Sequence, residues 1–271
     1  MSERTTAETR LWQPTWTQAM TDFRGEHDEP PFDDVTVRMT VPASIGGDHV
    51  RFELSNRFGD EPVLIGRSAI SVGERSLDVA FAGQPSIEIS AGESRWIDPI
   101  ELTVRHGENV VIDLYLPDPT PYATAAGFMF ARSLPGDFAG SRELPLEGST
   151  PKAIDASREF PAANMDTVPE PDGTGWSLPA GGPFLRTIEV AGVRARAVIV
   201  ALGGSSTAMG WPQYTARLLP ADARIAVVNR SISGNRLEAK YAAPDNTHPN
   251  VNGEKRLAQT MVETIARLQL Y

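Results

Sequence analysis

The sequence predicts an α+β chain in two parts: an N-terminal antiparallel β-sandwich, followed by a shorter α/β part with a parallel sheet. Two observations support this fold class. Short segments of alternating apolar and polar residues fill residues 35–116, whereas residues 197–202 form one uninterrupted apolar run. Alternation is typical of strands with one buried face, and a continuous run is typical of a strand buried on both faces. We place the sandwich in residues 1–183 and the α/β part in residues 184–271.

The strands of the first part are marked by the period of their apolar residues. In residues 35–41, valine and methionine alternate with threonine and arginine. The same pattern returns in residues 50–54, 87–89, 100–104 and 110–116. Glycine-containing turns separate these segments, and many short strands at such spacing are typical of an antiparallel sandwich. From about residue 117 an irregular linker follows, with one further strand expected around residues 126–130.

The second part alternates strands and helices. We expect strands at residues 184–190, 197–202 and 225–228, and helices at residues 212–219 and 251–270. Pro212 falls in the first turn of its helix, where a missing backbone N–H leaves no hydrogen bond unmade. The last helix presents one apolar face, formed by Leu257, Met261, Ile265 and Leu268.

Composition excludes several classes of protein. A formal net charge of −10 argues against a nucleic acid or an anionic membrane as partner. The chain has no cysteine, which removes disulfides, thiolate nucleophiles and thiolate metal sites. No His/Asp/Glu cluster has ligand spacing, so we expect neither a metal nor a cofactor. No apolar stretch approaches the ~18 residues of a membrane span, and the N-terminus lacks the apolar segment of a secretion signal. We therefore expect a soluble chain, cytoplasmic by default.

A candidate nucleophile follows the continuous apolar run. After Leu202 the sequence continues Gly203-Gly204-Ser205, so Ser205 is expected at the carboxyl end of a parallel strand. Ligands bind at that edge in open α/β sheets. The two glycines let the backbone turn sharply and keep side chains away from an incoming acyl group. Glycine–serine turns after strands are common, so this motif by itself also fits a purely structural turn.

A second motif, Asp-Asn-Thr-His-Pro-Asn at residues 245–250, precedes the last expected helix. Asp245 can fold back onto His248 and fix its tautomer, so that the other ring nitrogen can accept a proton from a serine hydroxyl. A serine, a histidine and an aspartate are the set used for acyl transfer by a hydroxyl nucleophile. The alternative is structural: Asp245 and Asn250 are then helix caps and His248 is a surface residue.

Together these motifs resemble the blocks of the SGNH, or GDSL-like, serine hydrolases. The segment through Ser205 resembles the first block, Gly-Asp-Ser-Ile-Thr. Residues 229–236, Asn-Arg-Ser-Ile-Ser-Gly-Asn-Arg, resemble the second block, and residues 245–250 resemble the fifth, Asp-x-x-His-Pro. Residues 45–59 are similar to the β-rich domain that precedes the catalytic part in one bacterial branch.

The resemblance implies a role for each matching residue. Ser205 is the implied nucleophile, His248 the general base and Asp245 the carboxylate that orients it. The backbone N–H groups of Ser205 and Gly234 are the implied oxyanion donors. The implied fold of the second part is a truncated SGNH-type α/β domain with a flavodoxin-like parallel sheet, and no cofactor is implied.

The chain also departs from the family pattern. Gly204 stands where the family carries an aspartate, and Ala208 replaces a second commonly acidic position. The third block, Gly-x-Asn-Asp, is absent, because only ten residues join Gly234 to Asp245. Its asparagine is an oxyanion donor, and losing one such donor typically lowers turnover by ~10²–10³. The shortened sheet would leave the nucleophile strand with an unpaired apolar edge, so we expect exposed apolar surface there. Either the β domain or a second copy of the chain, in a homo-oligomer through that edge, would have to cover it.

Two functional hypotheses follow. The first is a serine ester hydrolase acting on small-molecule or carbohydrate acyl esters through an acyl-enzyme, with activity reduced by the missing block. The second is a non-catalytic β-sandwich that binds carbohydrate and carries a degenerate hydrolase remnant. The aromatic residues that could stack on a sugar are Trp96 and Tyr115. Packing in the core or at a sheet edge explains the presence of both residues equally well. A phosphate-binding turn at Gly203 and Gly204 is a weaker interpretation, because the full Gly-x-Gly-x-x-Gly spacing is absent.

Overall fold

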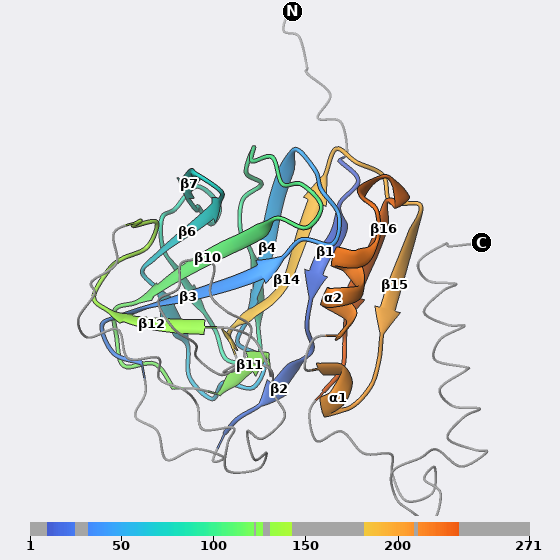
Figure 1. The fold of residues 1–271 in the computed structure, drawn as a ribbon. Coiled ribbons are helices and arrows are strands. Elements are labelled where there is room, and N and C mark those ends of the chain that lie inside the picture. The colour runs from blue at the N-terminus through green and yellow to red at the C-terminus, as the bar shows by residue number, and fades with distance from the viewer. Residues whose placement is uncertain are drawn as a thin grey trace, which may run out of the picture.

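The fold is β-rich, and nearly all of its strand pairs are antiparallel. The computed structural model describes residues 10–24, 32–121, 123–126, 131–142, 182–208 and 211–232. Two larger sheets share one apolar core, and a short parallel pair of strands with two helices lies beside them (Figure 1). The prediction of a β-rich first part is therefore confirmed.

The larger sheet has the strand order β12-β3-β10-β6-β7. Its strands are β3 (Val35–Pro42), β6 (Arg67–Val72), β7 (Arg75–Asp78), β10 (Asn109–Leu116) and β12 (Ala131–Pro135). β3 and β10 pair along their whole length, from Val35 opposite Leu116 to Pro42 opposite Asn109. Both were expected from their alternation, because every second side chain of such a strand must be buried.

The second sheet has the strand order β1-β14-β4-β9. Its strands are β1 (Gln13–Thr17), β4 (His49–Ser55), β9 (Ser94–Trp96) and β14 (Leu185–Ala191). Between the two sheets, Met39, Phe52, Ile112 and Ile188 are fully buried in one cluster. β14 corrects the sequence interpretation: its segment was assigned to the α/β part, but it pairs with β1 and β4 in the antiparallel sheet.

Smaller ladders close the ends of the sandwich. They consist of β2 (Met20–Asp22), β11 (Thr124–Ala126) and β13 (Gly182–Pro183) in one sheet, and β5 (Val63–Ile65) with β8 (Ile87–Ile89) in another. The expected strand at residues 100–104 is wrong, because Ile100 and Val104 form only isolated bridges with Val50 and Gly47. The strand expected around residues 126–130 begins earlier, at Thr124, and residues 127–130 lie outside the described part of the chain.

Within the described residues, the α/β part contains one parallel pair of strands, β15 (Ala197–Ala201) and β16 (Ile225–Asn229), in register from Ala197 opposite Ile225 to Ala201 opposite Asn229. The helices α1 (Ser205–Ala208) and α2 (Trp211–Leu218) connect them, followed by the 3-10 turn η3 (Ala221–Ala223). α2 packs on β16 (Figure 1). The expected helix at residues 212–219 is thus confirmed within a residue. The helix expected at residues 251–270 lies outside the described residues.

β1 anchors this parallel pair to the sandwich. β1 contacts β16, and the Thr17 hydroxyl donates to the Asn229 carbonyl at 3.2 Å. At the other end of β1, the Gln13 amide donates to the Val193 carbonyl and accepts from the Ala195 N–H at 2.7 Å. Polar groups at both ends of one strand therefore fix the position of the parallel pair.

β15 is not buried on both faces, contrary to the sequence prediction. Val198 packs against the sandwich core, whereas Ile199, which points to the opposite face, is 47% exposed. The reason is that α2, of the helices that the structure describes, lies over β16 rather than over β15. Among the described residues, no helix is both long and apolar enough to cross a membrane.

Candidate active site

Ser205 is the first residue of α1, directly after the strand β15 and the turn Leu202-Gly203-Gly204. The amides of Thr207 and Ala208 donate to the Gly204 carbonyl at 3.1 and 3.0 Å, which closes the first turn of the helix. The backbone of Ser205 therefore sits at the carboxyl end of a parallel strand and at the N-terminal end of a short helix. This is the position that the sequence predicts for it.

Gly203 is required by close packing rather than by an unusual backbone angle. Neither Gly203 nor Gly204 has a positive φ. A Cβ placed on Gly203 would lie 2.3 Å from Thr207 Oγ1 and 2.9 Å from Thr207 Cβ, closer than real carbon contacts allow. The sequence predicted that glycine is needed here for a sharp turn of the backbone. The structure instead shows a steric reason: residue 203 can lie against Thr207 of α1 only if it has no side chain.

Asn229 joins the end of β16 to both helices. Its side chain is buried, and its Nδ2 donates to the Thr207 carbonyl at 2.7 Å and to Gln213 Oε1 at 3.3 Å. Its Oδ1 accepts from the Ser231 N–H at 3.0 Å. Because Thr207 belongs to α1, this one amide fixes the distance between the Ser205 helix and the segment that follows β16.

The chain after β16 continues alongside the turn Leu202-Gly203-Gly204. The Arg230 N–H donates to the Ala201 carbonyl at 2.9 Å, and the Ile232 N–H donates to the Gly203 carbonyl at 3.1 Å. The second sequence block therefore runs beside the first, up to Ile232. Gly234, the expected second oxyanion donor, comes two residues later and lies outside the described residues.

A positive charge lies close to this end of β16. Burial lowers the pKa of the Arg230 guanidinium, and the charge of Arg186 lowers it further, while Glu53 opposes the change. Arg186 itself donates to Glu53 Oε1 at 2.9 Å. An arginine keeps its charge even in such surroundings. Arg230 therefore brings a fixed cation from the second block to the border between the parallel pair and the sandwich.

The remaining expected catalytic residues are not placed. Asp245 and His248 lie outside the described residues, as Gly234 does. Of the predicted set, the structure positions the backbone of Ser205 alone, so the triad and the oxyanion hole stay predictions. Asn229 belongs to the second block, but the sequence predicted no role for it. The available signal was a polar residue at the end of the apolar run Ile-Ala-Val-Val, where a strand ends.

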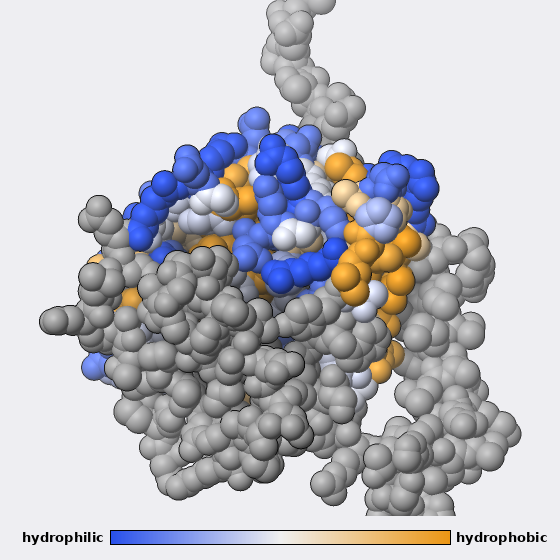
Figure 2. Space-filling model, viewed as in Figure 1, coloured by the Kyte–Doolittle hydropathy of each residue, from blue (hydrophilic) through white to orange (hydrophobic). Residues whose placement is uncertain are grey.

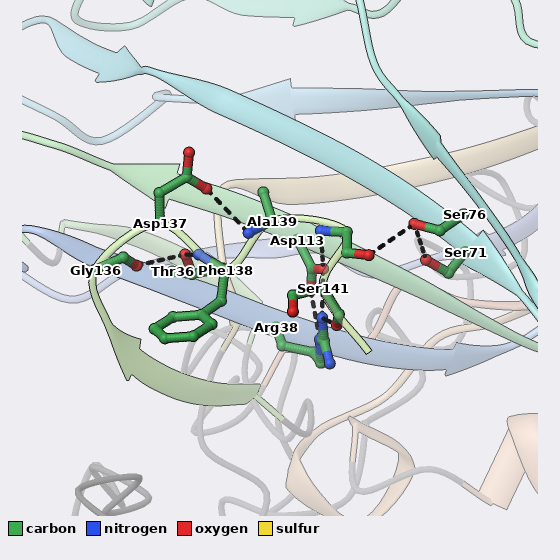
Figure 3. Close-up of polar contacts among 11 residues, drawn as sticks. Thr36, Arg38, Ser71, Ser76, Asp113, Gly136, Asp137, Phe138, Ala139 and Ser141 are labelled. Carbon is green, nitrogen blue, oxygen red and sulfur yellow. Dashed lines mark hydrogen bonds and ion pairs between the residues drawn. The ribbon is translucent and has the colours of Figure 1, made fainter. Parts of the chain in front are cut away.

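A second buried polar cluster lies in the larger sheet, away from Ser205 (Figure 3). Arg38 Nε and Nη2 donate to the two Asp113 carboxylate oxygens at 2.6 and 2.7 Å. The same carboxylate accepts from the Gly140 N–H at 2.8 Å, and Arg38 Nη2 also donates to the Ser141 carbonyl at 2.8 Å. Every charged group here has a partner, which indicates a structural role: the pair holds residues 136–142 on the sheet.

Two tryptophans enclose an arginine on the second sheet. The Arg51 guanidinium carbon lies 4.5 Å from the centre of the Trp12 ring and 4.4 Å from that of Trp96. Arg51 Nε and Nη2 donate to Glu189 Oε2 at 2.9 and 2.6 Å. Trp96 remains 36% exposed. Tyr115, the other aromatic candidate, belongs to the other sheet, so Trp12 is the ring that shares a face with Trp96.

Comparison with protein-family models gives no match for this chain, and comparison with curated proteins gives none either. The described residues contain no group of three or more His, Asp or Glu side chains that could hold a metal ion.

Proposed function

We propose that this protein is a serine ester hydrolase of the SGNH type that acts on small-molecule or carbohydrate acyl esters. One observation carries the proposal: Ser205 begins a helix at the carboxyl end of a parallel strand, and Gly203 is packed too tightly for any side chain. A serine in this position can meet a ligand from the open edge of the sheet. The finer fold assignment, a truncated flavodoxin-like domain, belongs to the same proposal and is supported by the parallel pairing of β15 with β16.

The reaction would proceed in two steps, acylation of Ser205 and hydrolysis of the acyl-serine. Ser205 Oγ attacks the ester carbonyl carbon while His248 takes the hydroxyl proton, and the alcohol leaves with that proton as the carbon–oxygen bond breaks. Water then attacks the acyl-serine and gives one proton to His248. His248 passes this proton to Ser205 Oγ as the bond between the acyl carbon and Oγ breaks, which releases the carboxylic acid and restores the serine hydroxyl. Asp245 orients His248 throughout. The N–H groups of Ser205 and Gly234 would stabilise the oxyanion of both tetrahedral intermediates.

Hydrolysis of a short-chain nitrophenyl ester tests this proposal. Ser205→Ala should reduce turnover to the uncatalysed background, because the hydroxyl is the attacking group. Ser206→Ala is the matched control, since it removes a hydroxyl from the next residue of α1 and should retain the rate of the unchanged protein. Equal rates for the unchanged protein and Ser205→Ala would reject the hydrolase.

A covalent probe gives a second readout that does not depend on turnover. A fluorophosphonate should add to one serine, and peptide mass spectrometry should find the adduct on Ser205 and not on Ser206. The rate of labelling should rise as the pH increases through the pKa of His248, ordinarily ~6.5, because a general base must be neutral. Labelling at a different serine would contradict the proposed nucleophile.

A second candidate function, carbohydrate binding by the sandwich, is favoured by the partly exposed Trp96 ring above Arg51. An exposed indole beside an arginine and Glu189 offers a stacking face and polar partners for sugar hydroxyls. Retention on an immobilised glycan that Trp96→Ala abolishes would support this function. Retention that the substitution leaves unchanged, or no retention at all, would reject it at this site.

A further inference from the structure

The outer edge of β15 has no partner strand among the described residues, where β15 pairs with β16 alone. In Figure 1 it is the outermost described strand on its side of the molecule. Residues 197–202 contain neither a charge nor a proline. Natural edge strands usually carry lysine, proline or a bulge to prevent pairing with other chains. β15 has none of these protections along residues 197–202.

Apolar side chains surround this edge. Ile199 of β15 is 47% exposed, although a strand in the middle of a sheet would bury it, and Leu202, directly after the strand, is 48% exposed. Figure 2 shows hydrophobic residues gathered over β15, β16 and α2, next to a mainly hydrophilic surface over the sandwich. Exposed apolar surface next to unpaired backbone groups is typical of an interaction site.

The sequence of β15 suits pairing with itself in the antiparallel direction. In a pair centred on Ile199, each Ile199 faces the other, and Arg196 lies opposite Leu202. The aliphatic part of the arginine can then cover the exposed leucine while its charge reaches water. A parallel pair would instead place Arg196 opposite Arg196, and like charges directly opposite are unfavourable. The distribution of charge therefore favours a two-fold symmetric, antiparallel contact.

We propose that the outer edge of β15 binds β15 of a second copy of this chain. The result is a continuous four-stranded sheet in which the two β15 strands are central and the two β16 strands are outermost. Each copy supplies the same surface to the other, so the assembly closes as a dimer. This inference goes beyond the proposed hydrolysis and does not depend on it.

The mass of the full chain in solution tests the dimer. Light scattering should give twice the chain mass of 29.4 kDa. Ile199→Glu should give the monomer, because two carboxylates would meet at the two-fold axis. Leu218→Glu is the matched control: Leu218 is 86% exposed on α2, which packs on β16 rather than on β15, and this variant should remain dimeric. Unchanged far-ultraviolet circular dichroism would establish that both variants are folded.

An engineered disulfide tests the register, since the chain has no cysteine of its own. Residues directly opposite each other in an antiparallel pair have Cβ atoms ~4.5–5.5 Å apart, close to the span of a disulfide. Ile199→Cys should therefore cross-link two chains under mild oxidation, whereas Leu218→Cys should not. A monomeric unchanged chain at every concentration, or an Ile199→Cys thiol that neither cross-links nor reacts with a thiol reagent, would overturn the proposal. The unreactive thiol would mean that residues of the same chain cover the edge.

Discussion

Asn229 and Thr207, 22 residues apart in the sequence, are joined by a 2.7 Å hydrogen bond from the asparagine Nδ2 to the threonine carbonyl. The bond runs between the end of a parallel strand and the short helix that begins with Ser205. Because the asparagine is buried, its amide has no water to replace the partner. The position of the candidate nucleophile thus depends on a residue from the next strand.

Asn229→Ala should destabilise the fold and lower ester hydrolysis. The Thr207 carbonyl and the Ser231 N–H would each lose a partner, at about 1–3 kcal/mol for each buried group left unpaired. Urea unfolding measures the loss. Gln213→Ala is the control, because it removes the longer 3.3 Å bond and should cost less. Equal midpoints for Asn229→Ala and the unchanged protein would show that the asparagine does not hold α1.

Gly203→Ala should be destabilising, because the new Cβ would lie 2.3 Å from Thr207 Oγ1. Overpacking of this kind costs about 1–3 kcal/mol. Adding Thr207→Ala removes the hydroxyl and should restore part of the stability, although the contact to Thr207 Cβ remains. Unfolding midpoints of the single and double variants provide the measurement. If Thr207→Ala gives no recovery in the Gly203→Ala background, the steric account is wrong.

Asp113→Ala should be among the most destabilising substitutions in the sandwich. It leaves the guanidinium of Arg38, whose side chain is 17% exposed, without its carboxylate, and breaking a buried pair typically costs about 3–5 kcal/mol. Replacing both residues, Arg38→Met with Asp113→Leu, should recover much of this loss. Arg67→Ala, which breaks an exposed pair with Asp78, should cost no more than about 1 kcal/mol. Similar losses for the buried and exposed pairs would contradict the argument.

The Tyr115 hydroxyl should titrate later than an ordinary tyrosine. It donates to Asp34 Oδ1 at 2.7 Å, and this hydrogen bond, with some burial and the negative charge of Asp34, raises the pKa of Tyr115. A raised pKa in the folded state means that the contribution to stability is present below the unfolded pKa of ~10 and is lost as pH rises through the folded value. Phenolate absorbance should follow this titration, with Tyr115→Phe identifying the signal. Asp34→Asn should lower the pKa; an unchanged titration would rule out the aspartate as its cause.

Strands with a regular period were predictable, and those defined by distant partners were not. β3 and β10 place apolar residues at every second position over most of their length, so their positions followed from the sequence. β14 was assigned to the wrong sheet, although polar residues recur along its segment Leu-Arg-Thr-Ile-Glu-Val-Ala, which suits a strand with one solvent-facing side. Residues 100–104 also alternate, but only isolated bridges connect them to their neighbours. A periodic sequence makes a strand possible, and a partner of matching length decides whether it forms.

In the candidate site, too, some features could be predicted from the sequence and others could not. The place of Ser205 after β15 followed from local order along the chain, namely an apolar run, two glycines and a helix. The contacts of Asn229 depend on where α1 and α2 pack, which no local pattern specifies. The exposure of Ile199 has a similar origin, because α2 packs on β16 rather than on β15. Asp245 and His248 stay predictions from their motif.

The pairing of Gln13 with Val190 has a consequence for biosynthesis. The first strand emerges from the ribosome long before its neighbour β14, which follows after more than a hundred residues. At ~5–20 residues per second, β1 must wait on the order of ten seconds or more for its partner. During this interval Trp16, buried in the finished protein, has no β14 to pack with. We expect the nascent chain to need protection by a chaperone until translation passes Ala191, and folding to be slow because its contacts are so distant in sequence.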